Sequence, residues 1–411
     1  MRHLYVHVPF CARRCSYCDF SIAVRAATPV DEYLTALRSE LKLGAVNGAT
    51  LDTVYLGGGT PSRLGGVGVA GVLDAVRDYA ELAPGAEVTV EANPDDVNDI
   101  AVAQWLAAGV NRISLGAQSF DDAVLDWMHR THNSGQIAQA VKAIHRGGID
   151  NISLDLIFAL PAHLERDWRK DVERALELAP AHVSLYGLTV EAHTPIAHWA
   201  DRGAVVEGSE AQYEEEFLFA HDAMSKGGFE HYEVSNFSLP GKASRHNSAY
   251  WTGAAYAGIG PSAHSFDGAS RRWNVAAYAE WVKRLANSQQ TVGGDETLTA
   301  ENRDAEEIYL GLRTQKGLAI EASELPVIET WRAAGWAEVE NIGTSSTFEA
   351  TSPCGLESSA SADSTPLPYR YWLRLTPTGW LRLDSIAADL AARRSTSRKA
   401  AASATPSHCY I

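Results

Sequence analysis

The chain has 411 residues, of which 45% are hydrophobic and 21% charged, and its formal net charge at pH 7 is −16. These proportions are typical of an ordinary globular protein and leave room for one large domain and a smaller one. The acidic balance argues against a nucleic-acid-binding groove, because affinity for a duplex depends on Lys and Arg side chains that neutralise phosphates.

Short β-rich runs alternate with amphipathic segments through the first 235 residues, a pattern that predicts a parallel sheet with helices outside it. The predicted strands are residues 4–8, 53–56, 87–91, 112–115, 152–157 and 183–188, and the predicted helices between them are 30–43, 69–79, 100–108, 137–146 and 168–178. Six such units, where a complete barrel has eight, indicate an open partial (β/α)6 barrel.

A cysteine-rich loop follows the first predicted strand. Cys11, Cys15 and Cys18 lie within eight residues of a chain that has only five cysteines. Three thiolates from one short loop can each bind one iron of a [4Fe–4S] cube, whereas the ferredoxin run supplies a fourth cysteine. The open iron can bind a chelating small molecule, and S-adenosylmethionine (SAM), with its amino and carboxylate groups, suits it. A reduced cluster can then split the sulfonium of SAM to a radical.

Zinc and disulfides are the alternative interpretations of these cysteines. A structural zinc site needs four ligands, and His7 is the only candidate for the fourth nearby. Disulfides are disfavoured because five is an odd number and nothing marks the chain as secreted. Cys354 and Cys409 lie far away in low-complexity sequence, and no role is predicted for them.

Polar and glycine motifs follow the next strands at the same ends. Residues 57–61 read Gly-Gly-Gly-Thr-Pro, which is either a tight turn or a place where backbone approaches a ligand closely. Glu91, Gln118, Arg130 and Asp155 lie at or just beyond strands three, four and five, where each could bind a ligand or, for the three charged residues, form a local salt bridge. Carboxyl ends of parallel strands meet at one edge, so we expect one site there. The run 214–216, three Glu residues, is expected to be a solvated helix face.

The remaining sequence predicts further regions. Residues 1–235 form the core, 236–300 an aromatic-rich connecting region, 301–392 an accessory domain with a Ser-rich insertion at 343–368, and 393–411 a low-complexity tail. A long helix is predicted at 210–226. Helices at 303–312, 327–334 and 378–390 with a strand at 372–375 indicate a small winged-helix-like α/β domain.

Together these motifs resemble the radical SAM family that contains the oxygen-independent coproporphyrinogen III oxidases and their HemW paralogues, over about residues 4–390. The quoted motifs are the cysteine run, 57–61, 91–94 (Glu-Ala-Asn-Pro), 116–120 (Gly-Ala-Gln-Ser-Phe), 155–157 (Asp-Leu-Ile) and 160–161 (Leu-Pro). The resemblance implies that SAM is contacted by Tyr5, Gly59, Thr60, Glu91, Gln118, Arg130 and Asp155, with Tyr17 against the adenine and Thr189 in the pocket. Relatives usually have glycines on both sides of Leu-Pro, where this chain has Ala159 and Ala162.

Two features separate the branches of this family. The oxidases have a further cysteine two positions after the third, where this chain has Phe20, and the HemW branch has the pattern His-Asn-x-x-Tyr-Trp, found here at 246–251. Both favour the HemW branch, which implies a heme chaperone that binds heme through residues such as His246 and Tyr250. His264 is another candidate iron ligand, and an aromatic core with a hydrogen-bonded His is the alternative interpretation of the motif.

The implied function is transfer of heme to an acceptor protein, respiratory and membrane-associated, without decarboxylation of coproporphyrinogen. The main rival is an oxygen-independent coproporphyrinogen III oxidase of heme biosynthesis, and a third is a radical SAM enzyme with an unrelated substrate. No apolar run reaches the roughly 18 residues of a spanning helix and no signal-peptide pattern opens the chain, so a cytoplasmic location is predicted.

Overall fold

The computed structural model describes residues 1–341 and 369–404. These residues form two compact units, the first made of 1–231, 235–249 and 255–296, and the second of 232–234, 250–254 and the residues from 297 on. Within the described ranges, no helix is long and apolar enough to cross a membrane. Cys354, Cys409 and the Ser-rich insertion predicted at 343–368 lie outside the described residues.

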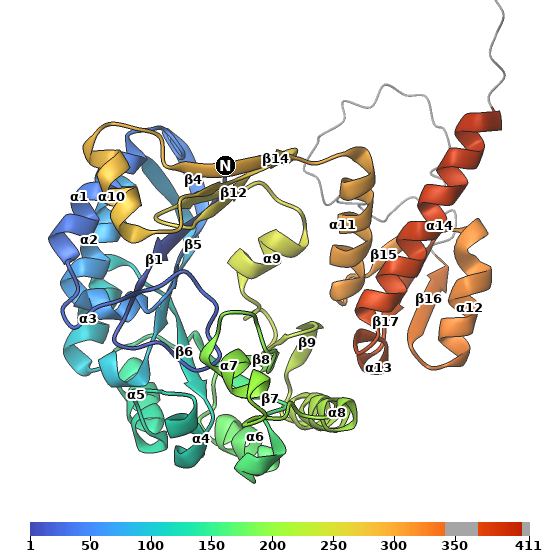
Figure 1. The fold of residues 1–411 in the computed structure, drawn as a ribbon, viewed down its shortest axis with the longest axis horizontal. Coiled ribbons are helices and arrows are strands. Elements are labelled where there is room, and N and C mark those ends of the chain that lie inside the picture. The colour runs from blue at the N-terminus through green and yellow to red at the C-terminus, as the bar shows by residue number, and fades with distance from the viewer. Residues whose placement is uncertain (342–368, 405–411) are drawn as a thin grey trace, which may run out of the picture. The chain divides into compact units, whose positions relative to one another are not determined.

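A nine-stranded sheet organises the first unit (Figure 1). Its order is β11 (Ala257–Ile259), β1 (His3–Val8), β4 (Ala49–Gly58), β5 (Ala80–Ala92), β6 (Arg112–Gln118), β7 (Ile152–Phe158), β8 (His182–Gly187), β10 (Asn236–Ser238) and β9 (Glu230–Glu233). Neighbouring strands from β11 to β8 are parallel, and β10 is antiparallel to β8. The sheet is open and does not close into a barrel. The six predicted strands are confirmed, and the three-residue β11 is too short to show a period in the sequence.

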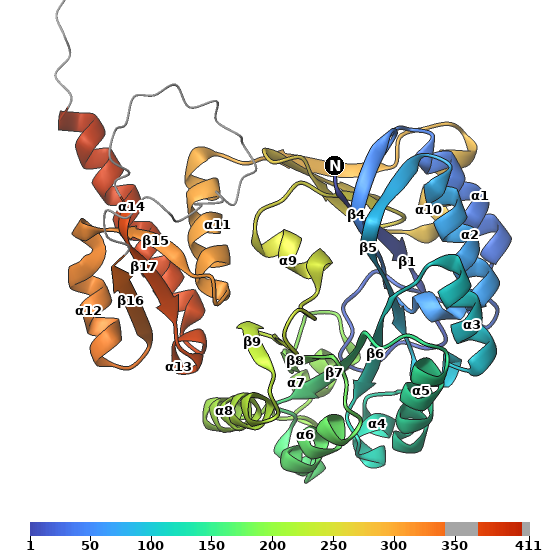
Figure 2. The ribbon, with the colours of Figure 1, turned by 180° about the vertical axis from the view of Figure 1, so that it is seen from behind.

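Helices flank this sheet, most of them on its outer face, as Figure 2 shows from behind. They are α1 (Val30–Leu41), α2 (Gly65–Arg77), α3 (Asp99–Ala108), α4 (Asp122–Trp127), α5 (Ser134–Arg146), α6 (Trp168–Glu177), α7 (Pro195–Asp201), α8 (Glu210–Lys226), α9 (Arg245–Trp251) and α10 (Tyr278–Ala286), with 3-10 turns η1 (Pro61–Leu64), η2 (Pro94–Asp96) and η3 (Ala162–Leu164). Local sequence sets several ends: the Asn98 side chain caps α3, and Asn133 with Gln136 forms a capping box on α5.

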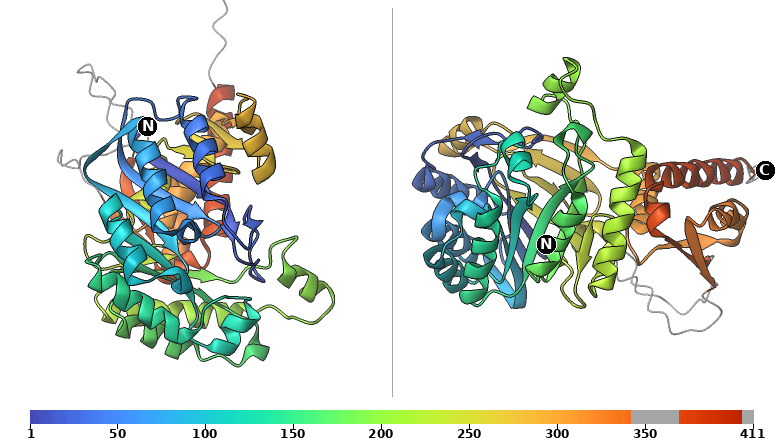
Figure 3. Two further views of the ribbon diagram at one scale, coloured as in Figure 1. Left: turned by 90° about the vertical axis from the view of Figure 1, so that its left-hand side faces the viewer. Right: turned by 90° about the horizontal axis from the view of Figure 1, so that it is seen from below.

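The inner face of the sheet is unusually polar for a parallel sheet, whose two faces are normally apolar. Thr53, Thr89, Arg112, Ser153 and His182 are all buried there or beside it at alternate strand positions. Figure 3 shows the curved sheet from two further sides, with α7 standing out from it. These buried polar side chains lie beneath the carboxyl ends of the strands, which is where a ligand site is expected in a parallel sheet of this kind.

Much of the aromatic-rich region packs into the first unit around a buried carboxylate. Glu40 of α1 is 4% exposed and accepts hydrogen bonds from Gly260 N (2.7 Å), Asn274 Nδ2 (2.6 Å), Trp281 Nε1 (3.0 Å) and Thr291 Oγ1 (3.0 Å). Burial raises the pKa of Glu40, and these donors oppose the rise. A second sheet of this region joins β12 (His264–Phe266), β13 (Ser270–Asn274) and β14 (Val292–Thr297).

The second unit contains a small antiparallel sheet in the order β15 (Leu318–Glu321), β17 (Tyr369–Leu375) and β16 (Ala337–Asn341). Its helices are α11 (Ala300–Arg313), α12 (Leu325–Ala333), α13 (Pro377–Trp380) and α14 (Leu383–Ala404), with the turn η4 (Ala322–Glu324). The helix predicted at 378–390 is therefore two helices. α14 continues to Ala404, into the predicted low-complexity tail, where Ala, Arg and Lys are good helix formers.

A short parallel pair holds the cysteine loop. After β1 the chain leaves the main sheet. β2 (Phe10–Cys11) then pairs in parallel with β3 (Ala23–Val24), and the segment between these two short strands forms a loop. Cys15 and Cys18 lie in the loop that this pair closes.

Candidate cofactor site

The three clustered cysteines line one cavity of about 330 Å³ at the carboxyl ends of the parallel strands. Cys11 is 9% exposed, and its Sγ lies 3.4 Å from Thr60 Oγ1. The backbone N–H of Cys18 donates to the Cys15 carbonyl oxygen at 3.4 Å. Burial raises the pKa of the Cys11 thiol and raises that of Cys18 to about 11. Because the thiolate is the metal ligand, these thiols lose their protons when a metal takes the protons' place.

The geometry favours a cluster over zinc. His7, the sequence candidate for a fourth zinc ligand, points elsewhere, because its Nε2 lies 2.9 Å from the Ser21 carbonyl oxygen and its Nδ1 lies 3.1 Å from Tyr5 Oη. Among the described residues, no group of three or more His, Cys, Asp or Glu side chains is arranged to hold a single metal ion. A cube needs no such group, since each thiolate binds a different iron.

The glycine turn after β4 brings backbone against the cysteine loop. Gly58 has φ of +114°, and a Cβ there would lie 2.5 Å from the His7 ring. A Cβ at Gly59 would lie 2.7 Å from the Pro9 carbonyl oxygen. Side chains are therefore excluded at both positions, for conformational and for steric reasons. The turn is a close approach of two backbones, and Gly58, Gly59 and Thr60 line the cavity.

Two carboxylates lie on the cavity wall. Glu91 accepts from Tyr55 Oη at 2.8 Å and from the Gly58 N–H at 3.0 Å, and Asp155 accepts from Ser114 Oγ at 3.0 and 3.2 Å. Burial raises the pKa of Glu91 to about 7, with the nearby Asp155 charge adding to the rise and the Tyr55 bond opposing it. Burial also raises the pKa of Asp155. Both groups can accept hydrogen bonds from hydroxyls of a ligand.

Arg130 links these walls to the cysteine loop. Its Nη1 donates to Cys15 Sγ at 3.4 Å and to Tyr17 Oη at 3.5 Å, and its Nη2 donates to Asn93 Oδ1 and to the Gly116 carbonyl oxygen. The side chain is buried, and Nε has no partner within the described chain. A buried guanidinium with a spare donor at a cavity wall suits an anionic ligand group.

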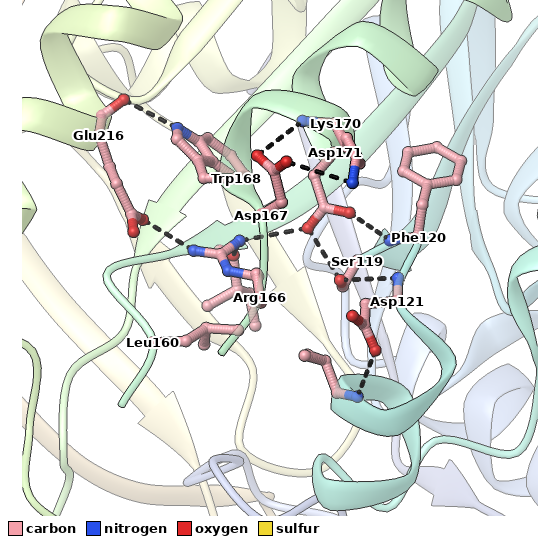
Figure 4. A network of polar contacts seen from close by, with 12 residues as sticks. Ser119, Phe120, Asp121, Leu160, Arg166, Asp167, Trp168, Lys170, Asp171 and Glu216 are labelled. Carbon is pink, nitrogen blue, oxygen red and sulfur yellow. Dashed lines mark hydrogen bonds and ion pairs between the residues drawn. The ribbon is translucent and has the colours of Figure 1, made fainter. Parts of the chain in front are cut away.

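Gln118 reaches the cavity from a turn in the left-handed region, with φ of +66°. This conformation is uncommon for a residue other than glycine and persists where the surroundings hold it. The residues just after it supply the restraint, because Asp171 of α6 accepts from Ser119 Oγ at 2.8 Å and from the Phe120 N–H at 2.7 Å. Figure 4 shows these two bonds.

Arg166 extends this network to α8 (Figure 4). Its Nη1 lies 3.2 Å from Asp171 Oδ2 and its Nη2 lies 2.7 Å from Glu216 Oε2, with the Arg166 and Asp171 side chains each 3% exposed. Glu216 also accepts the Ala159 N–H at 2.7 Å. The expectation that residues 214–216 form a solvated helix face is therefore wrong for Glu216, because Arg166 and the β7 turn supply partners from elsewhere in the chain.

The structure brings most of the predicted site residues together. Those that line the cavity are Cys11, Cys15, Tyr17, Cys18, Gly59, Thr60, Glu91, Gln118, Arg130, Asp155 and Thr189. Tyr5 lies behind the wall, with its ring stacked on that of Tyr55 at 6.2 Å. Sequence reasoning missed Tyr55, Ser114, His129 and Tyr186, and it quoted Asn93 only as part of a motif; all five also line the cavity. For Tyr55, Ser114 and Tyr186 the alternation of strands β4, β6 and β8 was the available signal, since every second residue faces inward, whereas Asn93 and His129 lie outside the strands.

The two predicted heme residues lie outside the cavity lining. His246 is 1% exposed, its Nδ1 lies 2.7 Å from Thr53 Oγ1, and its ring stacks on Tyr55 with centroids 5.1 Å apart. Burial lowers the pKa of His246 to about 3. Tyr250 belongs to the second unit, where the neighbouring Trp251 ring lies 4.2 Å from the Arg313 guanidinium carbon.

Comparison with known proteins gives consistent results. Residues 5–175 match the family model described as the radical SAM superfamily. A protein of Mycobacterium tuberculosis strain H37Rv named heme chaperone HemW is 39% identical over 322 residues, which are 77% of this chain and 83% of that protein. A protein of Lactococcus lactis with the same name is 37% identical over 320 residues, 78% of this chain and 83% of that protein.

A solved structure shares the fold. It is the Escherichia coli coproporphyrinogen III oxidase HemN, described as a radical SAM enzyme, with a TM-score of 0.74, 19% sequence identity, and coverage of 94% of this chain and 89% of that one. At this level of identity the likeness concerns the fold alone, and it confirms the predicted open α/β architecture.

Proposed function

Because this chain belongs to the radical SAM superfamily, and within it to the family of proteins named heme chaperone HemW, we propose that it binds heme and passes it to an acceptor protein. In this proposal it works with a [4Fe–4S] cluster and SAM. The observation that supports the cofactor set best is the single cavity that three thiols share with Glu91, Arg130 and Asp155. The acceptor that the family resemblance suggests is a respiratory, membrane-associated protein, and the expected location is the cytoplasm.

The residues of the cavity fit the two cofactors. Cys11, Cys15 and Cys18 would bind three irons, and the spare Nε donor of Arg130 suits the carboxylate of SAM. Glu91 and Asp155, held by Tyr55 and Ser114, would accept hydrogen bonds from ribose hydroxyls. The chemistry that a bound, reduced cluster would supply is an electron for SAM, and these side chains would position the two groups.

Phe20 favours the chaperone over the oxidase. It occupies the position at which the oxidases have a further cysteine, and its ring lines the rim of the cavity while 60% exposed. A phenyl ring can neither bind iron nor exchange protons, whereas an exposed apolar ring at the rim can contact a flat apolar ligand. The assignment of His246 and Tyr250 to heme binding stays a prediction.

The decisive experiment compares two activities of one anaerobically reconstituted preparation. Titration with heme, followed by its Soret absorption, is expected to show saturable binding. Incubation of the reduced, SAM-loaded protein with coproporphyrinogen III is expected to yield no protoporphyrinogen. Formation of protoporphyrinogen would reject the chaperone proposal and support the oxidase, and absence of heme binding would reject it in favour of a radical SAM enzyme with another substrate.

A further inference from the structure

Two tryptophan and two histidine rings form a continuous row beside the cofactor cavity. Ring centroids are 6.2 Å apart for His163 and Trp127, 5.7 Å for Trp127 and Trp199, and 5.5 Å for Trp199 and His129. The four residues come from α4, the turn after it, η3 and α7, so the row is assembled from three separate stretches of the chain. We call these four residues the aromatic shelf.

The aromatic shelf rests on an apolar base. Val124, Met128, Ile157 and Leu160 form a buried cluster, and partly buried hydrophobic side chains that include Trp127 pack over it. Two of the packed residues, Leu188 and Tyr17, line the cofactor cavity, as His129 does. The shelf is thus continuous with the cavity wall, and both tryptophans remain partly exposed. Partly exposed indole rings on an apolar base, here tilted by 56° to each other, offer apolar contacts to a ligand with a large aromatic ring system.

The imidazoles of the aromatic shelf are available for a metal. Neither the His129 ring nor the His163 ring makes a hydrogen bond or ion pair within the described residues, and both are partly or largely exposed. His246 differs, because it is buried with Nδ1 against Thr53. His129 also has φ of +59°, an uncommon backbone conformation, and it lines the cofactor cavity.

Backbone contacts join the aromatic shelf to the cysteine loop. The Ser16 N–H donates to the Met128 carbonyl oxygen at 3.1 Å, and the Ile196 N–H donates to the Ser16 carbonyl oxygen at 2.9 Å. Ser16 stands between Cys15 and Cys18, so one residue of the loop holds both the segment of His129 and the helix of Trp199. The loop that would hold the cluster therefore also sets the spacing of the aromatic shelf.

From these observations we propose that the aromatic shelf binds heme, with the His129 imidazole as axial ligand of the iron and the Trp127 and Trp199 rings against the porphyrin; this rests on the proposed function. Heme combines an apolar plane, an iron that takes an axial imidazole, and two carboxylates. The exposed Arg13, which lines the same cavity and has no ion pair within the described chain, suits a heme carboxylate.

The test is a heme titration of the reconstituted full chain and matched variants. His129→Asn removes the imidazole while keeping a residue that tolerates positive φ, and it is expected to raise the Kd at least about tenfold and to shift the Soret band. Trp199→Leu is expected to raise the Kd about fivefold, as expected for the loss of an aromatic stack. His145→Ala, an imidazole on α5 paired with Asp150, is the control and should bind like the parent.

Iron content and the urea unfolding midpoint of each variant serve as the folding check, since Cys11, Cys15 and Cys18 are the proposed iron ligands and His129 is not among them. Heme binding by His129→Asn and Trp199→Leu with the affinity and spectrum of the parent would overturn the inference and leave the chaperone proposal intact. A Soret shift in His163→Ala or His246→Ala but not in His129→Asn would also overturn it. If the parent chain binds no heme, the proposed function fails first, and the inference with it.

Discussion

At the scale of single residues, the site depends on side chains whose ionisation is shifted by burial. The thiols of Cys11 and Cys18, and the carboxyls of Glu91 and Asp155, all have raised pKa values for that reason. Burial favours the neutral forms of these groups until a cationic partner binds. A cluster and a sulfonium ligand would be cationic partners of this kind, so their binding would be coupled to proton release.

The first prediction concerns the cluster ligands. Replacing Cys11, Cys15 or Cys18 by Ala is expected to abolish the [4Fe–4S] absorption of the reconstituted protein, because each thiolate binds its own iron. Iron and sulfide analysis measures the loss. Cys354→Ala and Cys409→Ala are the matched controls and should keep about one cluster; cluster loss in either control would show that the ligands are assigned wrongly.

The second prediction concerns pH. Glu91 accepts a ribose hydroxyl most strongly when it is ionised, and with a pKa of about 7 it is mostly protonated at pH 6 and mostly ionised at pH 8. SAM affinity should therefore fall about tenfold as the pH falls from 8 to 6. Calorimetry on the cluster-loaded protein measures the slope. Glu91→Gln, which cannot ionise, should bind more weakly at pH 8 and lose this dependence; an unchanged slope in that variant would contradict the assignment.

At the scale of elements, turns after the strands place the site residues, and long-range hydrogen bonds to carboxylates hold those turns. Asp171 is 51 residues from Phe120 and Glu216 is 57 residues from Ala159 along the chain. Both anchored turns contain a residue other than glycine with positive φ, Gln118 and Ala159. The network of Figure 4 therefore offsets backbone strain at two strand ends.

The third prediction tests this network. Asp171→Asn breaks a buried ion pair and is expected to lower the free energy of unfolding by about 3 kcal/mol. It should also weaken SAM binding, because the turn that holds Gln118 is released. The control Arg174→Ala, on the same helix, removes an exposed pair with Glu177 and should change stability by less than about 1 kcal/mol. Urea unfolding and calorimetry measure both effects, and an Asp171→Asn variant with full SAM affinity would show that the network only stabilises the fold.

The fourth prediction uses the two alanines around Leu160 and Pro161. Ala159 has φ of +56°, whereas Ala162, the first residue of η3, has negative φ. Ala159→Gly is therefore expected to raise the free energy of unfolding by about 1 kcal/mol, because glycine adopts the left-handed region without a Cβ penalty. The matched Ala162→Gly should be neutral or lower stability by about 0.5 kcal/mol. Chemical unfolding of both variants measures the difference; equal effects would contradict the strain at Ala159.

At the scale of the whole molecule, one cavity couples several distant segments, so ligand binding should stabilise the chain. Cavity residues come from the cysteine loop and from the ends of β4, β5, β6, β7 and β8. A ligand that contacts them all binds the folded state and not the unfolded one, and it shifts the unfolding equilibrium by mass action.

The fifth prediction follows from this linkage. SAM at about 100 times its Kd should raise the free energy of unfolding of the cluster-loaded protein by about 2.7 kcal/mol. Arg130→Ala should show a much smaller rise at the same SAM concentration, because its guanidinium lines the cavity. Arg146→Ala, which removes a surface pair with Asp99, should respond to SAM like the parent. Thermal unfolding with and without SAM measures the shift, and an equal shift in both variants would show that Arg130 does not contact SAM.

Local patterns in the sequence determined much of this protein. Short β-rich runs predicted the six parallel strands, and apolar residues at three- and four-residue spacing predicted most of the helices. Such patterns follow from local backbone geometry. The spacing of Cys11, Cys15 and Cys18 predicted one loop, and the order of motifs at strand ends predicted that Glu91, Gln118 and Asp155 would share its cavity. Parallel strands bring their carboxyl ends together, so chain order was enough there.

Only the tertiary structure decided the rest, because it depends on contacts between residues far apart in the chain. The His246 ring forms a hydrogen bond with Thr53, which is 193 positions away in the chain, and this contact holds its imidazole in the interior. Glu216 likewise pairs with Arg166, which is 50 positions away. The row formed by His163, Trp127, Trp199 and His129 likewise comes from separate segments. Local sequence periodicity does not predict which loops contact one another, since the conformation of a loop is set by its packing against the sheet and not by the conformational propensity of its residues.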